Sequence, residues 1–111
     1  MPAEEITYRL IKAIEANPEA SQRELAREMG ISLGKLNYCL KGLTEKGLVK
    51  MQNFRNSQNK LGYLYLLTPK GLQAKSRITA RYLQRRMEEY EALKAEIEQL
   101  QAEMDRRPET E

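Results

Sequence analysis

Residues 21–50 read SQRELAREMGISLGKLNYCLKGLTEKGLVK, and this segment contains the start and stop signals of two successive helices. Ser21 is followed three residues later by a glutamate, a capping-box pattern that predicts the start of a helix. Gly30 suits the left-handed backbone that ends a helix, and Ser32 can cap the next helix directly afterwards. This next helix is expected to stop at Gly47. Two helices joined by a tight turn predict a helix-turn-helix.

The flanking sequence adds one helix before this stretch and a hairpin after it. Residues 4–17 carry apolar side chains at helical spacing and are followed by Pro18, which predicts a first helix. Beyond the helix-turn-helix the apolar period changes from 3.6 to 2, so residues 48–54 and 63–67 are predicted strands. The polar segment 55–62 forms the expected tip between them. Three helices followed by a hairpin predict a winged helix-turn-helix, a mainly α fold with a small β wing.

A long helix is predicted to follow the hairpin. Thr68 is a suitable N-cap and Pro69 a suitable first residue. From residue 70 to about residue 107 no proline occurs, which predicts one helix too long for a domain of this size to cover. We therefore expect two parts. Residues 1–67 form the winged helix-turn-helix, and residues 68–111 form a long C-terminal coiled-coil helix with a frayed end.

Apolar residues in the long helix recur at steps of three and four, the spacing of a heptad seam. The residues assigned to this seam are Leu83, Met87, Tyr90, Leu93, Ile97, Leu100 and Met104. Because pairing of two chains buries such a seam, we expect a homodimer. The alternative is a helix that folds back onto its own domain. The orientation of the two chains stays open, because in a parallel pair Glu89 would meet Lys94 in a contact worth only a few tenths of a kcal/mol.

The composition argues against an enzyme. The sequence has 111 residues, enough for one domain, and it contains no histidine, the commonest general base and metal ligand. Its single cysteine excludes an intramolecular disulfide and a multi-cysteine zinc site. We expect no catalysis, no metal and no cofactor. The first residues do not resemble a signal peptide, and no apolar stretch approaches the ~20 residues of a membrane span, which favours a cytoplasmic protein without membrane contact.

Positive charge gathers in the middle of the chain. Residues 32–67 contain six basic residues and a single acidic one, which indicates a polyanionic partner. An α-helix fits the major groove of B-DNA, so we expect the recognition helix, residues 32–46, to enter the major groove of double-stranded DNA. The wing, residues 55–62, would contact the flanking backbone or the minor groove. The alternative is an ordinary solvated basic face.

Individual side chains can be assigned to this DNA-binding surface. Helical periodicity puts Tyr38 and Lys41 opposite the apolar side of the recognition helix, with Lys35 and Asn37 beside them. Lysine can contact guanine, asparagine can pair with adenine, and tyrosine can reach phosphate or a thymine methyl. The remaining candidates are Arg55 and Lys60 in the wing and Ser21, Gln22 and Arg23 at the start of the second helix. Wing cations can enter a narrow minor groove, and a helix N-terminus suits phosphate.

Several segments carry a resemblance to a known family. QRELAREMGIS and LTEKGLVK resemble the winged helix of the multiple-antibiotic-resistance regulator (MarR) family. LGKLNYCLK, NFRNSQNKLGY and LLTPKG resemble one subgroup, the MarR regulators associated with extracellular polysaccharide (EPS), and the similarity extends through MEEYEALKAEI. The resemblance implies a bacterial, homodimeric transcriptional regulator of exopolysaccharide genes. It also implies that four residues face DNA, namely Ser32, Lys35, Asn37 and Tyr38.

Two other functions compete with this interpretation. A protein-interaction or adaptor module would use the winged helix and the coiled coil without binding DNA, although the basic third helix and wing argue against it. A sensor would hold a small-molecule effector, whose identity is left open, in the dimer interface.

Overall fold

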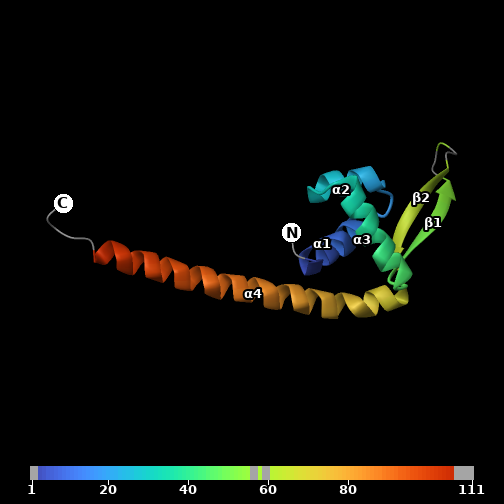
Figure 1. Cartoon of the computed structure of the whole chain (residues 1–111). Helices are drawn as coiled ribbons and strands as arrows, with labels where there is room; N and C mark the ends of the chain where they lie inside the picture. The colour runs from blue at the N-terminus through green and yellow to red at the C-terminus, as the bar shows by residue number, and fades with distance from the viewer. Residues whose placement is uncertain (1–2, 56–57, 59–60, 107–111) are drawn as a thin grey trace.

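The computed structural model describes residues 3–55, 58 and 61–106. Its elements, shown in Figure 1, are α1 (Ala3–Ala16), α2 (Gln22–Met29), α3 (Leu33–Glu45), β1 (Val49–Arg55), β2 (Leu61–Leu67) and α4 (Pro69–Asp105). The two strands form one antiparallel hairpin. The predicted mainly helical winged helix-turn-helix with a long C-terminal helix is confirmed. None of the helices in the described residues combines the length and apolar character that a membrane span needs.

The caps form at the predicted residues. The Ser21 hydroxyl accepts a hydrogen bond from the Glu24 backbone N–H at 3.1 Å, and it donates to the Glu24 carboxylate at 3.2 Å. Ser32 caps α3 in the same way, accepting from the Lys35 N–H at 3.1 Å. Gly30, with φ of 68°, ends α2 in the left-handed conformation that a side chain would disfavour. The turn between α2 and α3 is therefore determined locally.

The hairpin is longer than predicted. Strand β2 begins at Leu61 instead of residue 63, because Arg55 pairs with Leu61 and Phe54 pairs with Gly62. The Phe54 ring lies directly on Gly62, where an added Cβ would come within 2.8 Å of it. An aromatic ring that covers a cross-strand glycine extends the ladder into a segment that looks like a turn from its sequence alone.

The core draws on every element. Its fully buried large side chains are Leu10, Ile11, Ile14, Leu25, Leu36 and Val49. The start of α4 also belongs to this core, because Ala74 is buried and Gly71 packs so closely on the Leu48 carbonyl that a Cβ would lie 2.0 Å from the oxygen. Packing thus continues past residue 67, the boundary expected from the sequence.

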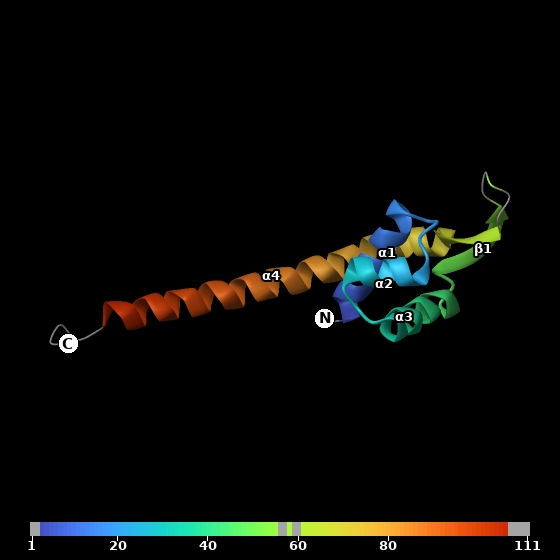
Figure 2. The same cartoon turned by 90° about the horizontal axis from the view of Figure 1, so that it is seen from above.

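Helix α4 runs along α1 and then leaves the domain (Figures 1 and 2). The rings of Tyr8 and Tyr82 stack with centroids 4.6 Å apart, and Lys75 pairs with Glu15 at 2.8 Å. Further along α4, Arg85 forms an ion pair with Glu4 of α1 at 3.6 Å. Beyond it α4 extends into solvent, so that the molecule measures 76 × 28 × 22 Å.

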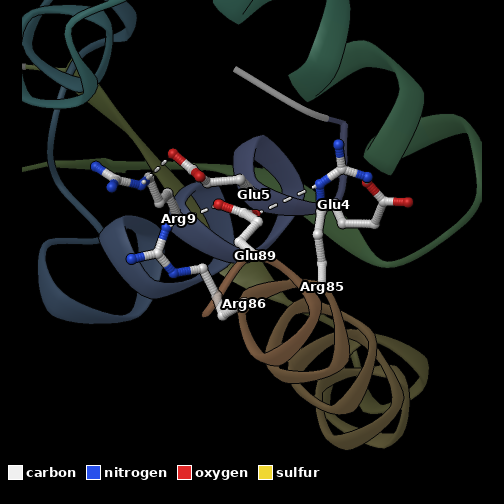
Figure 3. A network of polar contacts seen from close by, with 6 residues as sticks. All are labelled: Glu4, Glu5, Arg9, Arg85, Arg86 and Glu89. Atoms are coloured by element: carbon white, nitrogen blue, oxygen red, sulfur yellow. Dashed lines mark hydrogen bonds and ion pairs between the residues drawn. The ribbon is translucent and has the colours of Figure 1, made fainter. Parts of the chain in front are cut away.

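A network of charged side chains lies where α4 leaves α1 (Figure 3). Its members are Glu4, Glu5, Arg9, Arg85, Arg86 and Glu89. Glu89 is paired within its own helix, with Arg85 at 3.8 Å and Arg86 at 3.3 Å. Exposed ion pairs of this kind add little stability individually, so the Tyr8–Tyr82 stack and the buried turn around Ala74 hold α4 in place.

Candidate nucleic-acid interface

The outer face of α3 carries four of the predicted DNA-contacting residues. Lys35, Asn37 and Lys41 are exposed, and the Tyr38 side chain is 77% exposed. The opposite face is buried through Leu36, Leu40 and Leu43. The predicted division of α3 into an inner and an outer face therefore matches the structure. Cys39 is half-buried against the core.

This face is basic and has few internal partners. Lys41 makes one loose ion pair with Glu45 at 4.0 Å, between side chains that are both well exposed. Within the described part of the chain, no acidic side chain pairs with Lys35. An added Cβ at Gly34 or Gly42 would meet nothing within 4 Å. Internal packing therefore does not require these two glycines, although each lowers the stability of a helix.

The start of α2 lies beside the wing. Ser21 and Arg23 are exposed at this end. Gln22 is half-buried, and its Nε2 donates a hydrogen bond to the Tyr65 hydroxyl at 2.9 Å. Because Tyr65 belongs to β2, Gln22 connects the helix-turn-helix to the wing, a positioning role that its sequence neighbourhood did not reveal.

A groove of about 640 Å³ separates the start of α2 from the hairpin. Its lining includes Ser21, Arg23, Leu33, Met51 and Tyr63. The groove brings the start of α2, which is predicted to contact phosphate, to the same surface as the two strands that carry the wing. Met51 and Tyr63 are residues that sequence reasoning missed, since their alternation indicates only a strand.

Of the wing candidates, Arg55 lies at the exposed end of β1, where it pairs with Leu61. Lys60 lies outside the described residues, as do residues 56, 57 and 59 of the predicted wing. On the other flank of α3, Lys35, Tyr38 and Lys41 line a second groove, of about 460 Å³, together with Thr7 and Lys46. Lys46 was not among the sequence candidates, because it follows the last turn of α3.

All seven residues of the predicted dimerisation seam are exposed on α4. Their side chains, from Leu83 to Met104, are between 45% and 63% exposed. Leu72, about one and a half heptads before Leu83 on α4, is exposed to a similar degree. It was not predicted to belong to the seam. Over residues 90–104 none of the other described elements packs on α4, so the helix does not fold back onto its own domain there.

The comparisons with known proteins agree with this geometry. Residues 4–50 match the family model described as winged helix-turn-helix DNA-binding. No curated protein matches the chain by sequence. The fold is similar to that of the PcaV transcriptional regulator from Streptomyces coelicolor, solved with its natural ligand (TM-score 0.63, 20% identity, 96% of this chain and 72% of PcaV covered).

Two further solved structures share the fold. A MarR/EmrR family transcriptional regulator from Acinetobacter sp. ADP1 has a TM-score of 0.56 at 17% identity, over 92% of this chain and 76% of that one. FabT from Streptococcus pneumoniae, solved in complex with DNA, has a TM-score of 0.50 at 20% identity, over 90% and 72%. None of these three neighbours is described as an enzyme. Residues 4–50 thus match the winged helix-turn-helix DNA-binding family, and the fold of the chain is similar to that of solved transcriptional regulators, one of them of the MarR/EmrR family.

Proposed function

We propose that this chain is a MarR-type transcriptional regulator, without catalytic activity, that binds specific double-stranded DNA sequences as a homodimer. The observation that carries the proposal is the outer face of α3. It presents a largely exposed tyrosine, an asparagine and two lysines on one helix. The family-model match over residues 4–50 supports the same conclusion.

In the proposed complex, residues 32–46 lie in the major groove. Lys35 and Asn37 would read base edges through hydrogen bonds, while Tyr38 and Lys41 contact phosphate or a thymine methyl. The start of α2 and the hairpin strands flank one groove, and so the start of α2 and the wing at the end of those strands would contact DNA on the same side of the molecule. In this arrangement Gln22 contributes by holding the wing against α2 through Tyr65.

The homodimer is supported by the exposed seam on α4. Apolar side chains in heptad spacing that no described part of the chain covers are buried when two copies pair. Pairing would also place two recognition helices in one assembly, so that binding of the first raises the effective concentration of the second.

The regulated genes are proposed to be those of exopolysaccharide biosynthesis. The support for this assignment is the resemblance carried by LGKLNYCLK, NFRNSQNKLGY and LLTPKG, which lie in α3, in the wing region and at the start of α4.

Selection of DNA from a random duplex library by the full-length protein tests the proposal. We expect an enriched sequence motif, and mobility shifts in which the enriched duplex competes much better than random duplex. The double variant Lys35→Ala/Asn37→Ala should lose the enriched motif, whereas Lys12→Ala, an exposed lysine on α1, should keep it. Binding to no duplex at all would overturn the proposal in favour of an adaptor module.

A further inference from the structure

The heptad positions of the predicted seam continue toward the start of α4. Continuing the heptad positions toward the start of the helix reaches Leu72, which is 56% exposed, by way of the exposed residues Ser76 and Thr79. We call residues 72, 76, 79, 83, 86, 90, 93, 97, 100 and 104 the extended seam. It therefore runs over almost the whole length of α4.

The winged domain, meaning α1–α3 and the hairpin, leaves the extended seam open. The α4 residues that pack on this domain are Gly71, Ala74, Ile78 and Tyr82. At about 100° per residue, these positions lie about a third of a turn around the helix from the extended seam. A second helix can consequently lie along the whole of α4 without meeting the winged domain of the same chain.

The two small side chains of the extended seam, Ser76 and Thr79, both lie in its first half, whereas every residue of its second half is large. A parallel pair would place like against like, so that Ser76 faces Ser76, Arg86 faces Arg86 and Ile97 faces Ile97. An antiparallel pair with its two-fold axis at residue 88 places both small side chains opposite large ones. It pairs Leu72 with Met104, Ser76 with Leu100, Thr79 with Ile97, Leu83 with Leu93 and Arg86 with Tyr90. Helix interfaces pack well when large and small residues face each other.

Charge along α4 is divided in the same way. Residues 70–86 contain six basic and no acidic residues, whereas residues 87–105 contain seven acidic residues and only Lys94. Antiparallel pairing sets the basic half of one helix against the acidic half of the other, and parallel pairing sets like charges together. The one contact that favours a parallel pair, Glu89 with Lys94, is weakened because Glu89 already pairs with Arg85 and Arg86.

From these observations we propose that two copies of α4 pair antiparallel over their full length, with the two-fold axis at residue 88. This inference rests on the proposed homodimer and specifies its orientation and register. Met87, which lies beside the extended seam, would then meet its own counterpart near the axis. This contact near the axis would explain why residue 87, which is not an a or d position of the extended seam, is an exposed methionine.

Antiparallel pairing also directs both recognition helices toward one DNA duplex. The two-fold axis of such a pair is perpendicular to the helices and to the line joining them. Because the winged domain packs on α4 about a third of a turn from the extended seam, it projects roughly along that axis. In Figure 2, α1 and α2 lie between α4 and much of α3, and the outer face of α3 is exposed, so we infer that this face points away from the helix pair. Both recognition helices therefore face the same side. A parallel pair, whose axis runs along the helices, would direct them to opposite sides.

The register predicts a spacing for the two DNA-binding units. Contacts between α4 and the winged domain centre near residue 78, ten residues from the axis at residue 88. At 1.5 Å per residue, the two winged domains lie about 30 Å apart along the helix pair. Successive major-groove half-sites are separated by about 34–36 Å, so the proposed pair fits one turn of DNA.

The orientation of the two α4 helices can be tested by measuring distances between spin labels. The labels are attached to the full-length protein in which Cys39→Ser has removed the native cysteine. A label at Gln99→Cys, exposed and off the extended seam, is expected about 33 Å from its counterpart, because residue 99 lies opposite residue 77. Parallel chains would bring the two labels side by side, at a separation set by the interhelical distance of about 8–10 Å plus the label arms. A label at Glu88→Cys is the matched control, because residue 88 lies level with its counterpart in either orientation.

Disulfide trapping gives an independent readout. An equimolar mixture of Leu83→Cys and Leu93→Cys chains should form a crosslinked heterodimer, and neither variant alone should crosslink. Efficient self-crosslinking of Leu83→Cys, or a short Gln99 distance, would overturn the antiparallel proposal while leaving the DNA-binding homodimer intact. Absence of any distance at Glu88→Cys would instead remove the homodimer itself.

Salt provides a third readout without any substitution. Because the antiparallel pair is held partly by opposite charges, raising the salt from about 0.05 M to 0.5 M should weaken DNA-free dimerisation severalfold in sedimentation equilibrium. A parallel pair would be strengthened by the same change, and that result would contradict the proposal.

Discussion

Apolar side chains are buried in the winged domain and exposed on the far half of α4, the part beyond Arg85. In the winged domain, leucines and isoleucines from α1, α2 and α3 are buried against one another, and Val49 and Tyr65 of the hairpin complete the core. On α4 beyond Arg85, every large apolar side chain from Met87 to Met104 is exposed. The winged domain thus buries its apolar side chains within one chain, whereas the apolar side chains on the far half of α4 stay uncovered. The two regions should therefore respond to different perturbations.

The largest effect should come from salt acting on the winged domain. If a dimer makes about six to ten phosphate contacts, its DNA affinity should fall about 10³–10⁵-fold between about 50 and 200 mM salt. Fluorescence anisotropy with a labelled duplex measures this slope. A flat response would mean that the basic face of α3 and the wing do not contact phosphate.

The second-largest effect should come from a substitution in the far half of α4. Ile97→Asp places a charge in the centre of the seam, and we expect a folded monomer whose DNA affinity is about 10²–10⁴-fold lower, because the two contacts are no longer linked. Sedimentation and anisotropy measure the two changes, and Gln99→Asp, exposed and off the seam, is the matched control. An Ile97→Asp dimer with unchanged affinity would show that the winged domain acts without the α4 seam.

Single substitutions on the outer face of α3 should have a smaller effect that is specific for sequence. Lys35→Ala and Asn37→Ala should each cost about 1–3 kcal/mol on the preferred duplex and little on random duplex. Arg55→Ala should instead weaken binding to many sequences, because a wing arginine contacts the backbone or the minor groove. If all three variants lose specific and random binding equally, the α3 residues contact only the DNA backbone.

The smallest effect concerns two glycines with opposite surroundings. Gly34→Ala should stabilise the fold by about 0.4–1 kcal/mol in urea denaturation, because its Cβ enters open space, and it should lower DNA affinity if the α3 backbone closely approaches the duplex. Gly71→Ala is the contrasting variant, since its Cβ would collide with the Leu48 carbonyl and destabilise the protein. A destabilised Gly34→Ala variant would contradict the open outer face of α3.

Features set by neighbouring residues were predicted correctly from the sequence. The cap at Ser21, the left-handed turn at Gly30 and the inner and outer faces of α3 depend on residues within one or two helical turns. The start of β2 was misplaced for the opposite reason. The ladder reaches Leu61 because the Phe54 ring covers Gly62 from the other strand, and a tip of polar residues does not reveal that contact.

The order of the elements, the outward side chains of α3 and the heptad spacing on α4 follow from the sequence alone, because capping and helical periodicity are local properties. The face of α4 that the winged domain occupies depends on tertiary contacts between residues far apart in the chain, such as Tyr8 with Tyr82. The same holds for Gln22, whose hydrogen bond to Tyr65 joins α2 to the wing. Such contacts depend on how the elements pack in space, and a pattern of neighbouring residues does not predict that packing.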